Sequence, residues 1–154
     1  MKFKHLLCLP LALGLLALSD SAPAGPGVWT SSGPAGGRAG VLVASPFTAN
    51  EFYVLGNGTV FKSIDGGTTW AESSAGINRR VFQLVHSGTA AGRLLASNAS
   101  KVWYSDDGGV SWLDRSPSAA LLGTESIGRL AASEALPGTY YASTSDGRIL
   151  VTED

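Results

Sequence analysis

The sequence predicts an all-β fold made of repeated, four-stranded antiparallel units. Three observations predict it: an octapeptide that occurs twice, short apolar runs that precede each copy at matching distances, and Gly- or Asn-containing turn signals between those runs. The chain has 20 Gly among 154 residues and 15% charged residues, which suits short strands and tight turns better than helices. After the N-terminal segment no helical periodicity extends over a useful length.

The octapeptide is Ser-Ile-Asp-Gly-Gly-Thr-Thr-Trp at residues 63–70 and Ser-Asp-Asp-Gly-Gly-Val-Ser-Trp at residues 105–112, a displacement of 42 residues. Its third residue is a short carboxylate that can accept hydrogen bonds from the backbone N–H groups of the following loop. The paired glycines supply the positive φ angles of a tight turn. We expect the closing tryptophan to cover the turn and to bury its ring against its own unit. The residues to which we assign this structural role are Ser63, Asp65, Gly67, Thr69, Trp70, Ser105, Asp107, Gly109, Ser111 and Trp112.

Three apolar runs precede the octapeptide in each unit, and a fourth strand is expected to contain its tryptophan. The first runs lie at residues 41–45, 82–86 and 129–133, the second at 51–55, 93–96 and 139–142, and the third at 60–63, 102–105 and 149–152. From the leucine of the first run to the Ser or Thr that opens the octapeptide there are 21, 21 and 22 residues. A period near 40 residues with four strands per unit is typical of β-propeller blades. The sequence therefore predicts a partial β-propeller with blades at about 41–73, 81–115 and 127–154, the last incomplete.

The octapeptide resembles the Asp-box, also called the BNR repeat, whose pattern is Ser-x-Asp-x-Gly-x-Thr-Trp. The first copy fits at every defined position, and the second has Ser111 in place of Thr. Together with Trp29-Thr30, Gly33-Pro34, Gly36-Gly37 and Ser45-Pro46, the first copy resembles the opening of bacterial secreted Asp-box propellers of the sortilin and photosystem II assembly factor types and, more distantly, of xyloglucanase-type glycoside hydrolases. The likeness covers residues 28–154. It implies that the motif is a fold element away from any catalytic centre, but the motif occurs in hydrolases, receptors and assembly factors alike.

The segment Thr152-Glu153-Asp154 aligns with Ser63-Ile64-Asp65 and so begins a third octapeptide. Three blades cannot close a ring, and an open propeller leaves blade faces and strand edges without partners. We therefore expect the natural protein to be longer than this N-terminal fragment. A self-sufficient fragment or an assembly of several copies is the alternative.

Residues 1–24 have the three-part pattern of a secretory signal peptide: Lys2 and Lys4, an apolar run over residues 6–18, and small residues at Ala22 and Ala24. We expect cleavage before Gly25. The apolar run is shorter than the roughly 20 residues that cross a bilayer, so we expect no stable membrane insertion after cleavage and a periplasmic or extracellular location. Cys8, the only cysteine, lies in this segment, which leaves the mature chain without disulfides or a cysteine nucleophile.

Charge and composition narrow the classes of ligand. Residues 25–154 carry nine Lys and Arg against eleven Asp and Glu, a formal net charge of −2, with no clustered basic surface for nucleic acid. The Gly-rich stretch at 33–40 lacks the Lys-Ser or Lys-Thr ending of a phosphate-binding loop, and we expect no cofactor. Asp65 and Asp107 recur once per unit, which a single catalytic or metal site does not require, and we expect no metal.

Several residues are candidates for catalytic or ligand-binding groups. Paired carboxylates of the glycosidase type could come from four acidic residues in or near loops, although the interpretation as solvated loop residues is favoured for each: Asp114, Glu125, Glu134 and Asp146. His86 is the only histidine after residue 24, and we expect it at the surface. Trp103-Tyr104 and Tyr140-Tyr141 are expected to alternate between two faces of a strand, with stacking on a glycan as the alternative. The insertion at 116–125, with Leu121-Leu122, is either a contact patch or a lid on the core.

Two functions are compatible with these patterns. The first is an exported propeller module without enzymatic activity that acts as a binding or assembly scaffold for a protein or a polysaccharide. The second is the N-terminal part of a glycoside hydrolase of the sialidase or xyloglucanase type, although the Arg-Ile-Pro signature of sialidases is absent. The carboxylate pair of a hydrolase and its substrate are not identified by the sequence.

Overall fold

The computed structural model describes residues 26–27, 33–34, 38–87 and 89–153. The chain divides into two units, residues 1–31 and residues 32–154. Of the first unit only Pro26 and Gly27 are described, in a turn. The predicted signal peptide, its cleavage site and Trp29-Thr30 lie outside the described residues. Everything that follows concerns the second unit.

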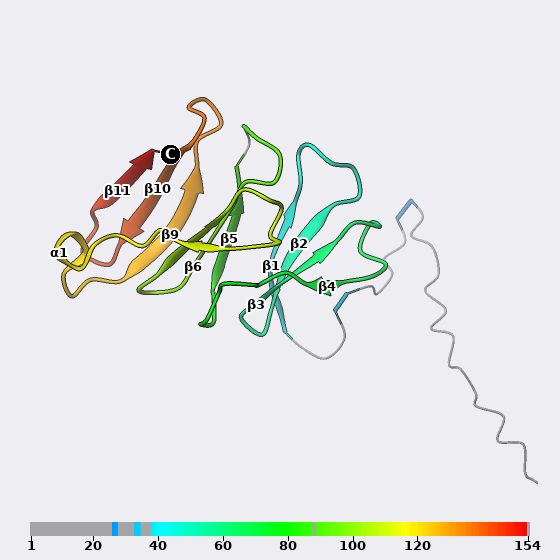
Figure 1. Ribbon diagram of the computed structural model, residues 1–154, viewed down its shortest axis with the longest axis horizontal. Coiled ribbons are helices and arrows are strands. Elements are labelled where there is room, and N and C mark those ends of the chain that lie inside the picture. Colours follow the sequence, from blue (N-terminus) through cyan, green and yellow to red (C-terminus); the bar gives the residue numbers. More distant parts are fainter. Residues whose placement is uncertain (1–25, 28–32, 35–37, 88, 154) are drawn as a thin grey trace, which may run out of the picture. The chain divides into compact units, whose positions relative to one another are not determined.

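The second unit contains three antiparallel sheets in which each strand pairs with its neighbour in sequence (Figure 1). The first sheet has the order β1 (Ala39–Ala44), β2 (Phe52–Gly56), β3 (Thr59–Ser63), β4 (Ala71–Glu72). The second has the order β5 (Gln83–His86), β6 (Leu94–Ser97), β7 (Val102–Ser105), β8 (Leu113–Asp114). The third has the order β11 (Ile149–Glu153), β10 (Thr139–Thr144), β9 (Ile127–Ala132). The predicted fold class, an all-β partial propeller, is confirmed.

One short helix, α1 (Ala119–Leu122), lies in the insertion between the second and third sheets, where no helix was expected. The Ser118 side chain accepts a hydrogen bond from the backbone N–H of Leu121 and so caps its start. Gly123 ends it with a φ of 66°. A single turn is too short to produce helical periodicity in the sequence, which explains why it escaped prediction. In the described residues no helix has the length and apolarity needed to cross a bilayer.

The register of the strands shows which residues are equivalent in the three sheets. Reading across the first three strands of each sheet, one row of paired residues is Leu42, Val54 and Phe61 in the first sheet, Leu84, Ala96 and Trp103 in the second, and Leu130, Ala142 and Leu150 in the third. We call this set the facing row of each sheet. In each sheet it includes the leucine of the first strand, so the repeat in the sequence is also a repeat in space.

Two apolar clusters form the core, one between each pair of consecutive sheets. The first contains Tyr53, Leu55 and Val60 from the first sheet and the facing row of the second sheet, together with Val81, Leu94 and Trp112. The second joins residues of the second sheet to Ile127, Tyr140 and Ala142 of the third, with Leu122 of α1. A propeller is stabilised in this way, because each sheet buries its apolar faces against its neighbours rather than against a common centre.

Strand β7 shows how one short strand serves both clusters. Trp103 and Tyr104 point to opposite faces of the sheet, as alternation predicts, and Trp103 belongs to the first cluster and Tyr104 to the second. The rings of Tyr104 and Tyr140 meet edge to face at 6.2 Å between centroids. At the first strands, β5 packs against both β1 and β9. There the backbone N–H of Leu130 donates to Gln83 Oε1 at 2.9 Å, which joins the third sheet to the second.

Candidate functional site

The first octapeptide folds into a turn closed by its own side chains. Ser63 Oγ donates to Asp65 Oδ1 at 2.8 Å and accepts from the backbone N–H of Gly67 at 2.8 Å. Asp65 Oδ1 also accepts from the backbone N–H of Thr69 at 2.8 Å, and Asp65 Oδ2 accepts from Thr69 Oγ1 at 2.6 Å. Gly66 and Gly67 have φ angles of 73° and 89°, which is the backbone conformation that favours glycine.

The second octapeptide repeats this pattern bond for bond. Ser105 Oγ donates to Asp107 Oδ1 at 2.8 Å and accepts from the backbone N–H of Gly109 at 2.9 Å. Asp107 accepts from the backbone N–H and the hydroxyl of Ser111 at 2.9 and 2.6 Å. Ser111, which departs from the Thr of the Asp-box pattern, therefore supplies the same two donors. The position needs a hydroxyl group, and the methyl group of Thr is dispensable for these bonds.

The donors around the two carboxylates favour their ionised form. The Thr69 hydroxyl, the Thr69 backbone N–H and the Ser63 hydroxyl lower the pKa of Asp65 to about 2. For Asp107 burial acts to raise the pKa, but the hydrogen bonds from Ser111 and Ser105 outweigh it, so the pKa is lowered. A general acid requires a raised pKa and a proton to donate. These carboxylates instead act as fixed acceptors that hold the turn.

The second octapeptide also binds the first sheet. Its Gly108 carbonyl oxygen accepts from Lys62 Nζ at 3.1 Å and lies 3.1 Å from the hydroxyl of Tyr53. Its Gly109 carbonyl oxygen accepts from Ser73 Oγ at 2.7 Å. A Cβ atom on Gly109 would lie 2.5 Å from Ser73 Oγ, so glycine is needed here for space as well as for its φ of 83°.

Lys62 and Tyr53 are themselves held by Glu51. Lys62 Nζ lies 3.0 Å from Glu51 Oε2, and the Tyr53 hydroxyl lies 3.0 Å from Glu51 Oε1. Burial acts to raise the pKa of Glu51, but its hydrogen bonds to Lys62 and Tyr53 outweigh burial and lower it. Burial and the neighbouring Glu51 carboxylate raise the pKa of Tyr53, which keeps its hydroxyl protonated at neutral pH. The side chains of Glu51, Lys62 and Tyr53 thus connect the first sheet to the turn of the second octapeptide.

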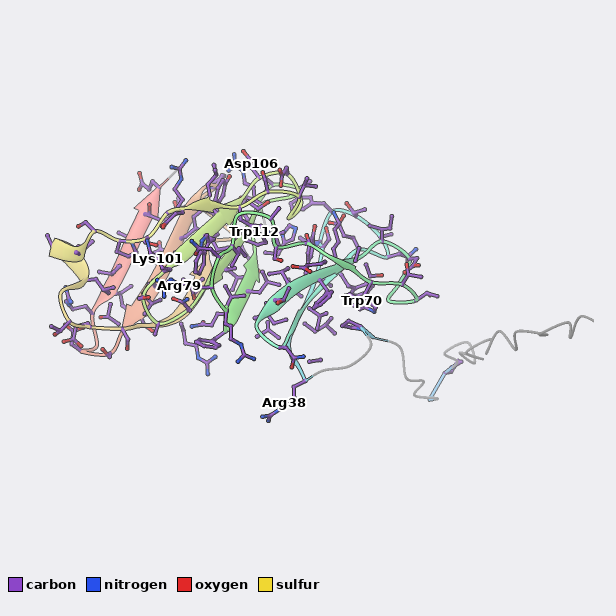
Figure 2. The ribbon with its side chains drawn as sticks, turned by 60° about the horizontal axis from the view of Figure 1, so that its bottom comes forward. Arg38, Trp70, Arg79, Lys101, Asp106 and Trp112 are labelled. Atoms are coloured by element: carbon purple, nitrogen blue, oxygen red, sulfur yellow. The ribbon has the colours of Figure 1, made fainter. Side chains whose placement is uncertain are left out.

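The tryptophans of the two octapeptides differ in their hydrogen-bond partners, and the ring of Trp112 packs in a cluster that joins its own sheet to the preceding one. Trp112 is 3% exposed, and its Nε1–H donates to the carbonyl oxygen of Ser73 at 2.8 Å, in the segment that follows the first sheet. Its backbone N–H donates to the carbonyl oxygen of Ala75 at 2.9 Å. Trp70 is only partly buried, and its Nε1–H donates to Gly67 of its own turn at 2.9 Å (Figure 2). The ring of Trp112 therefore packs between the second sheet and the first.

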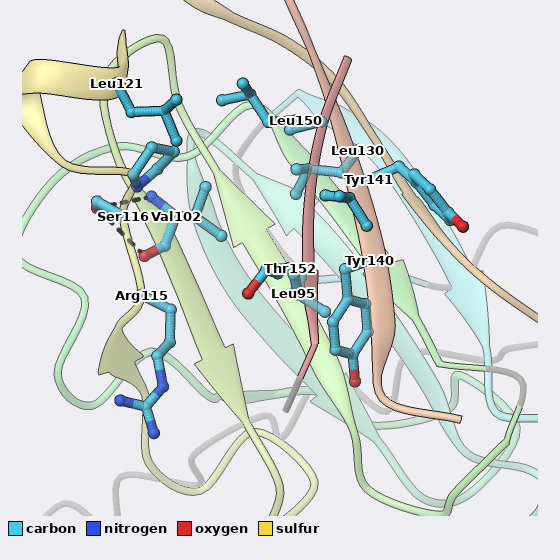
Figure 3. A pocket seen from close by; sticks show the side chains of 13 residues that line it. Leu95, Val102, Arg115, Ser116, Leu121, Leu130, Tyr140, Tyr141, Leu150 and Thr152 are labelled. Atoms are coloured by element: carbon cyan, nitrogen blue, oxygen red, sulfur yellow. Dashed lines mark hydrogen bonds between the residues drawn. The ribbon is translucent and has the colours of Figure 1, made fainter. Parts of the chain in front are cut away.

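A cavity of about 190 Å³ lies between the second and third sheets (Figure 3). The facing row of the third sheet, Leu130, Ala142 and Leu150, lines one wall. The opposite wall comes from the second sheet and from the segment that follows it: Leu95, Val102, Arg115, Ser116 and Pro117. Leu121 of α1 lies at the same cavity and is 50% exposed. The insertion is thus neither a separate patch nor a complete lid, because Leu122 is buried in the second cluster while Leu121 lines the cavity.

The acidic residues considered as a glycosidase pair are hydrogen-bonded to local groups. Lys101 Nζ contacts Asp114 Oδ2 at 2.5 Å and, with Ser116, lowers the pKa of Asp114 to about 2. The hydroxyl of Thr144 lowers the pKa of Asp146, which also pairs with Arg148.

Other sequence candidates also have local contacts. Glu125 accepts from the hydroxyl of Ser145 at 2.6 Å, and Glu134 is exposed. His86 is partly buried rather than at the surface, because its ring lies 5.9 Å from that of Phe47 and 6.3 Å from that of Tyr53. Within the described ranges, no three His, Cys, Asp or Glu residues are grouped so that they could hold a metal ion.

Several residues of this arrangement were not identified from the sequence. Ser73 and Ala75 accept the hydrogen bonds of Trp112, Lys62 binds the second turn, and Glu51 pairs with Lys62. The residues 42 positions after Glu51, Lys62, Ser73 and Ala75 are of different types: Arg93, Tyr104, Arg115 and Pro117. The repeat in the sequence therefore does not indicate a role for the first four residues. Contacts between two particular sheets are specific to that pair.

Comparison with known proteins shows the fold. No family model and no curated protein matches the chain. Among solved structures, YCF48 from Cyanidioschyzon merolae matches with a TM-score of 0.63 and 24% identity, over 80% of this chain and 37% of that one. An ancestral GH74 enzyme matches with a TM-score of 0.52 and 19% identity, over 77% of this chain and 19% of that one. A structure of YCF48 bound to D1 peptide has a TM-score of 0.39 and 15% identity, over 83% of this chain and 55% of that one. The chain thus spans 37% or less of the first two structures, and the likeness to them shows the propeller fold alone.

Proposed function

We propose that this chain belongs to an exported Asp-box β-propeller that acts as a binding or assembly scaffold for another polypeptide. Its two octapeptides are the fold elements of that propeller. The proposal assigns no catalytic step to the chain, because the carboxylates of both turns are engaged in holding those turns.

The observation that carries this proposal is the apolar cavity between the second and third sheets, which is lined in part by residues of β11. A concave and largely apolar site of this kind can take apolar side chains of a polypeptide. The lining is mainly leucine, valine, alanine and tyrosine, whereas a saccharide needs several polar groups to replace its hydration. A polypeptide is therefore favoured over a polysaccharide.

A selection experiment tests the proposed function. A random peptide library is selected against the immobilised chain, and the binders are tested against the variant Ala142→Leu, which reduces the volume of the cavity. Binders that lose affinity for this variant support the proposal. In parallel, xyloglucan oligosaccharides and sialylated glycans are tested for binding and hydrolysis. Glycan cleavage or glycan binding, without peptide binders that depend on the cavity, would replace the scaffold by the hydrolase alternative.

Export is a separate part of the proposal and depends on the pattern of residues 1–24. Expression of the whole gene product in a Gram-negative host, followed by fractionation and N-terminal sequencing, tests it. We expect a periplasmic or extracellular protein that begins at Gly25. A cytoplasmic protein that retains Met1 would remove export from the proposal without affecting the fold.

A further inference from the structure

Three arginines lie at the end of the first two sheets that is opposite to the octapeptides. Strand β3 runs from the turn at residues 57–58 to the first octapeptide, so this turn and the octapeptide are at opposite ends of the sheet. Arg38 precedes β1, Arg79 and Arg80 precede β5, and all three residues are exposed. The octapeptides carry acidic side chains instead, and Figure 2 shows Arg38 and Asp106 on opposite sides of the unit. The two ends thus differ in charge.

The repeat brings two of these arginines to the same turn. Arg38 and Arg80 are 42 residues apart, and each lies four residues before the leucine of the first strand in its unit. The third unit has Ser126 at this position. The backbone N–H of Arg38 donates to Asn57 Oδ1 at 3.3 Å, and Arg80 Nε donates to the carbonyl oxygen of Asn57 at 3.0 Å. Residues that are distant in the sequence therefore meet at the turn between β2 and β3.

This turn holds the side chain of Arg80 in place. The backbone N–H of Val81 donates to the carbonyl oxygen of Gly58 at 2.9 Å. A Cβ atom on Gly58, whose φ is 85°, would lie 2.9 Å from Arg80 Cβ, so glycine at this position lets the arginine pack across the turn. Arg80 Nε is engaged by the turn. Among the described residues its terminal nitrogens donate to no other group, so they are available to an anion.

A recess of about 230 Å³ lies beside the turn, between the first and second sheets, each of which has its four strands. Its polar lining residues are Arg38, Asn57 and Arg80. Its apolar lining comes from residues of both sheets: Val41, Leu55, Val81 and Phe82. In the described part of the chain no acidic residue lines the recess, and the ion pairs involve other cations than these arginines. Two cations beside apolar walls attract an anion more strongly than cations in bulk water do.

The lining favours one class of anion. A guanidinium group can donate two parallel N–H bonds to a carboxylate. Phe82 is 62% exposed next to these arginines, which suits a carboxylate that has an apolar neighbour. A saccharide carries hydroxyl groups around its ring, for which Asn57 is the one uncharged polar side chain in the lining. Nucleic acid presents a row of phosphates and needs a longer row of cations. An acidic polypeptide is therefore favoured.

We propose that this recess binds an acidic segment of a partner polypeptide. A Glu or Asp carboxylate of the segment lies between Arg38 and Arg80, and a neighbouring apolar side chain packs on Phe82. Arg79, next in sequence to Arg80, adds a third positive charge that attracts the segment. The recess shares no lining residue with the apolar cavity between the second and third sheets. The proposal therefore goes beyond the scaffold function assigned to that cavity and does not depend on it.

Peptide titration of the full chain tests this site. The probe is the peptide acetyl-Glu-Leu-Glu-Phe-amide, and its control is the same peptide with Gln in place of both Glu. In ¹H–¹⁵N spectra the acidic peptide should give saturable shifts of the backbone amide signals of Gly58 and Phe82, and the Gln peptide should bind at least about tenfold more weakly. Raising the NaCl concentration from about 50 to about 300 mM should weaken binding of the acidic peptide. Equal binding of the two peptides, or no saturable shift with either, would overturn the proposal.

Variants of the chain locate the peptide. Arg38→Gln and Arg80→Gln should each weaken binding by at least about tenfold, because each removes one charged donor. Arg129→Gln is the matched control, because Arg129 is exposed and does not line the recess. Among the described residues the Arg38 side chain donates no hydrogen bond, so Arg38→Gln should keep the fold even if Arg80→Gln loosens the turn, and circular dichroism checks both. Unchanged binding by the folded Arg38→Gln variant would contradict the proposal.

Other anions and the cavity variant complete the test. Sialyllactose, a galacturonate oligosaccharide and a single-stranded oligonucleotide are titrated in the same way. Tighter binding of any of these than of the acidic peptide, with the same dependence on Arg38, would replace the polypeptide by that anion and overturn the proposal. Ala142→Leu should leave binding of the acidic peptide unchanged. Loss of that binding in a folded Ala142→Leu variant would place the peptide in the cavity and refute the recess, whereas library peptides that do not need the cavity would refute the scaffold function alone.

Discussion

Trp70 and Trp112 close two octapeptides whose Ser and Asp side chains make the same hydrogen bonds, yet only Trp112 is buried. The difference arises outside the octapeptide. Trp112 meets the end of the preceding sheet at Ser73, whereas among the described residues no sheet covers the facing row of the first sheet, in which Leu42 is 64% exposed. The third sheet also has a preceding sheet, and a cavity of about 190 Å³ lies between the two. The turn is therefore stabilised by bonds within the octapeptide, whereas Trp112 connects the first sheet to the second.

The largest expected effect on stability comes from removing the ring of Trp112. Trp112→Ala should lower the free energy of unfolding by about 3–5 kcal/mol, the usual cost of truncating a buried aromatic side chain. Trp70→Ala should cost no more than about 2 kcal/mol, because part of that ring is already in water. Urea titration of both variants measures the difference. Equal losses would mean that the two rings contribute in the same way and that the preceding sheet adds nothing.

Glycine substitutions test how closely the second octapeptide approaches the first sheet. A Cβ atom on Gly76 would lie 2.3 Å from the backbone oxygen of Trp112. Gly123 has a similar positive φ but no atom within 4 Å of its Cβ position. Gly123→Ala should therefore cost about 1–2 kcal/mol for the backbone alone. Gly76→Ala should cost at least about 1–3 kcal/mol more for the added clash. Thermal unfolding of the pair checks this order, and a Gly76→Ala variant as stable as Gly123→Ala would contradict the packing.

Two lysine variants compare an ion pair between sheets with one at the surface. The side chains of Lys62 and Glu51 are 22% and 11% exposed, and Lys62 also binds the second turn, whereas Lys101 and Asp114 are 40% and 49% exposed. Lys62→Ala should lower stability by about 1–2 kcal/mol, because it removes the cation paired with a partly buried carboxylate and one of the donors to the Gly108 carbonyl group. Lys101→Ala should change it by less than about 1 kcal/mol. Chemical denaturation distinguishes them, and the reverse order would refute the inter-sheet role of Lys62.

The smallest effect is expected at the turn itself and depends on pH. Asp65 has a pKa of about 2 in the folded chain against an ordinary value of 3.8. A carboxylate whose pKa is lowered by folding stabilises the fold above the unfolded pKa, and this contribution is lost as pH falls from about 4 through about 2. Asp65→Asn should remove this part of the acid sensitivity. Acid titrations of both proteins, followed by tryptophan fluorescence, measure it, and identical curves would contradict the role of the carboxylate.

The sequence was sufficient for most features that repeat, although the fourth strands, β4 and β8, begin one residue after the tryptophan that they were expected to contain. Strand order, the turns at both octapeptides and the alternation of Trp103 and Tyr104 follow from apolar periodicity and from residues that recur after 42 positions. These features depend on local hydrogen bonds and on the period of a strand, and both are visible in a single sequence.

The sequence could not predict the contacts that occur between one pair of sheets only. Glu51, Lys62 and Ser73 have no equivalents in the second unit, so nothing in the repeat marked them. The partner of Trp112 could not be inferred from the octapeptide, because it lies 39 residues earlier in the chain. The cavity at the third sheet is likewise lined by residues of two sheets that lie far apart in the sequence, so no single unit of the repeat indicates it.

Hydrogen exchange at the indole N–H groups tests most directly whether Trp112 joins two sheets. In a ¹H–¹⁵N spectrum assigned by single Trp→Phe variants, the Nε1–H of Trp112 should exchange only through global unfolding. The Nε1–H of Trp70 should exchange orders of magnitude faster, through local opening of its turn. Comparable exchange rates for the two groups would contradict the account.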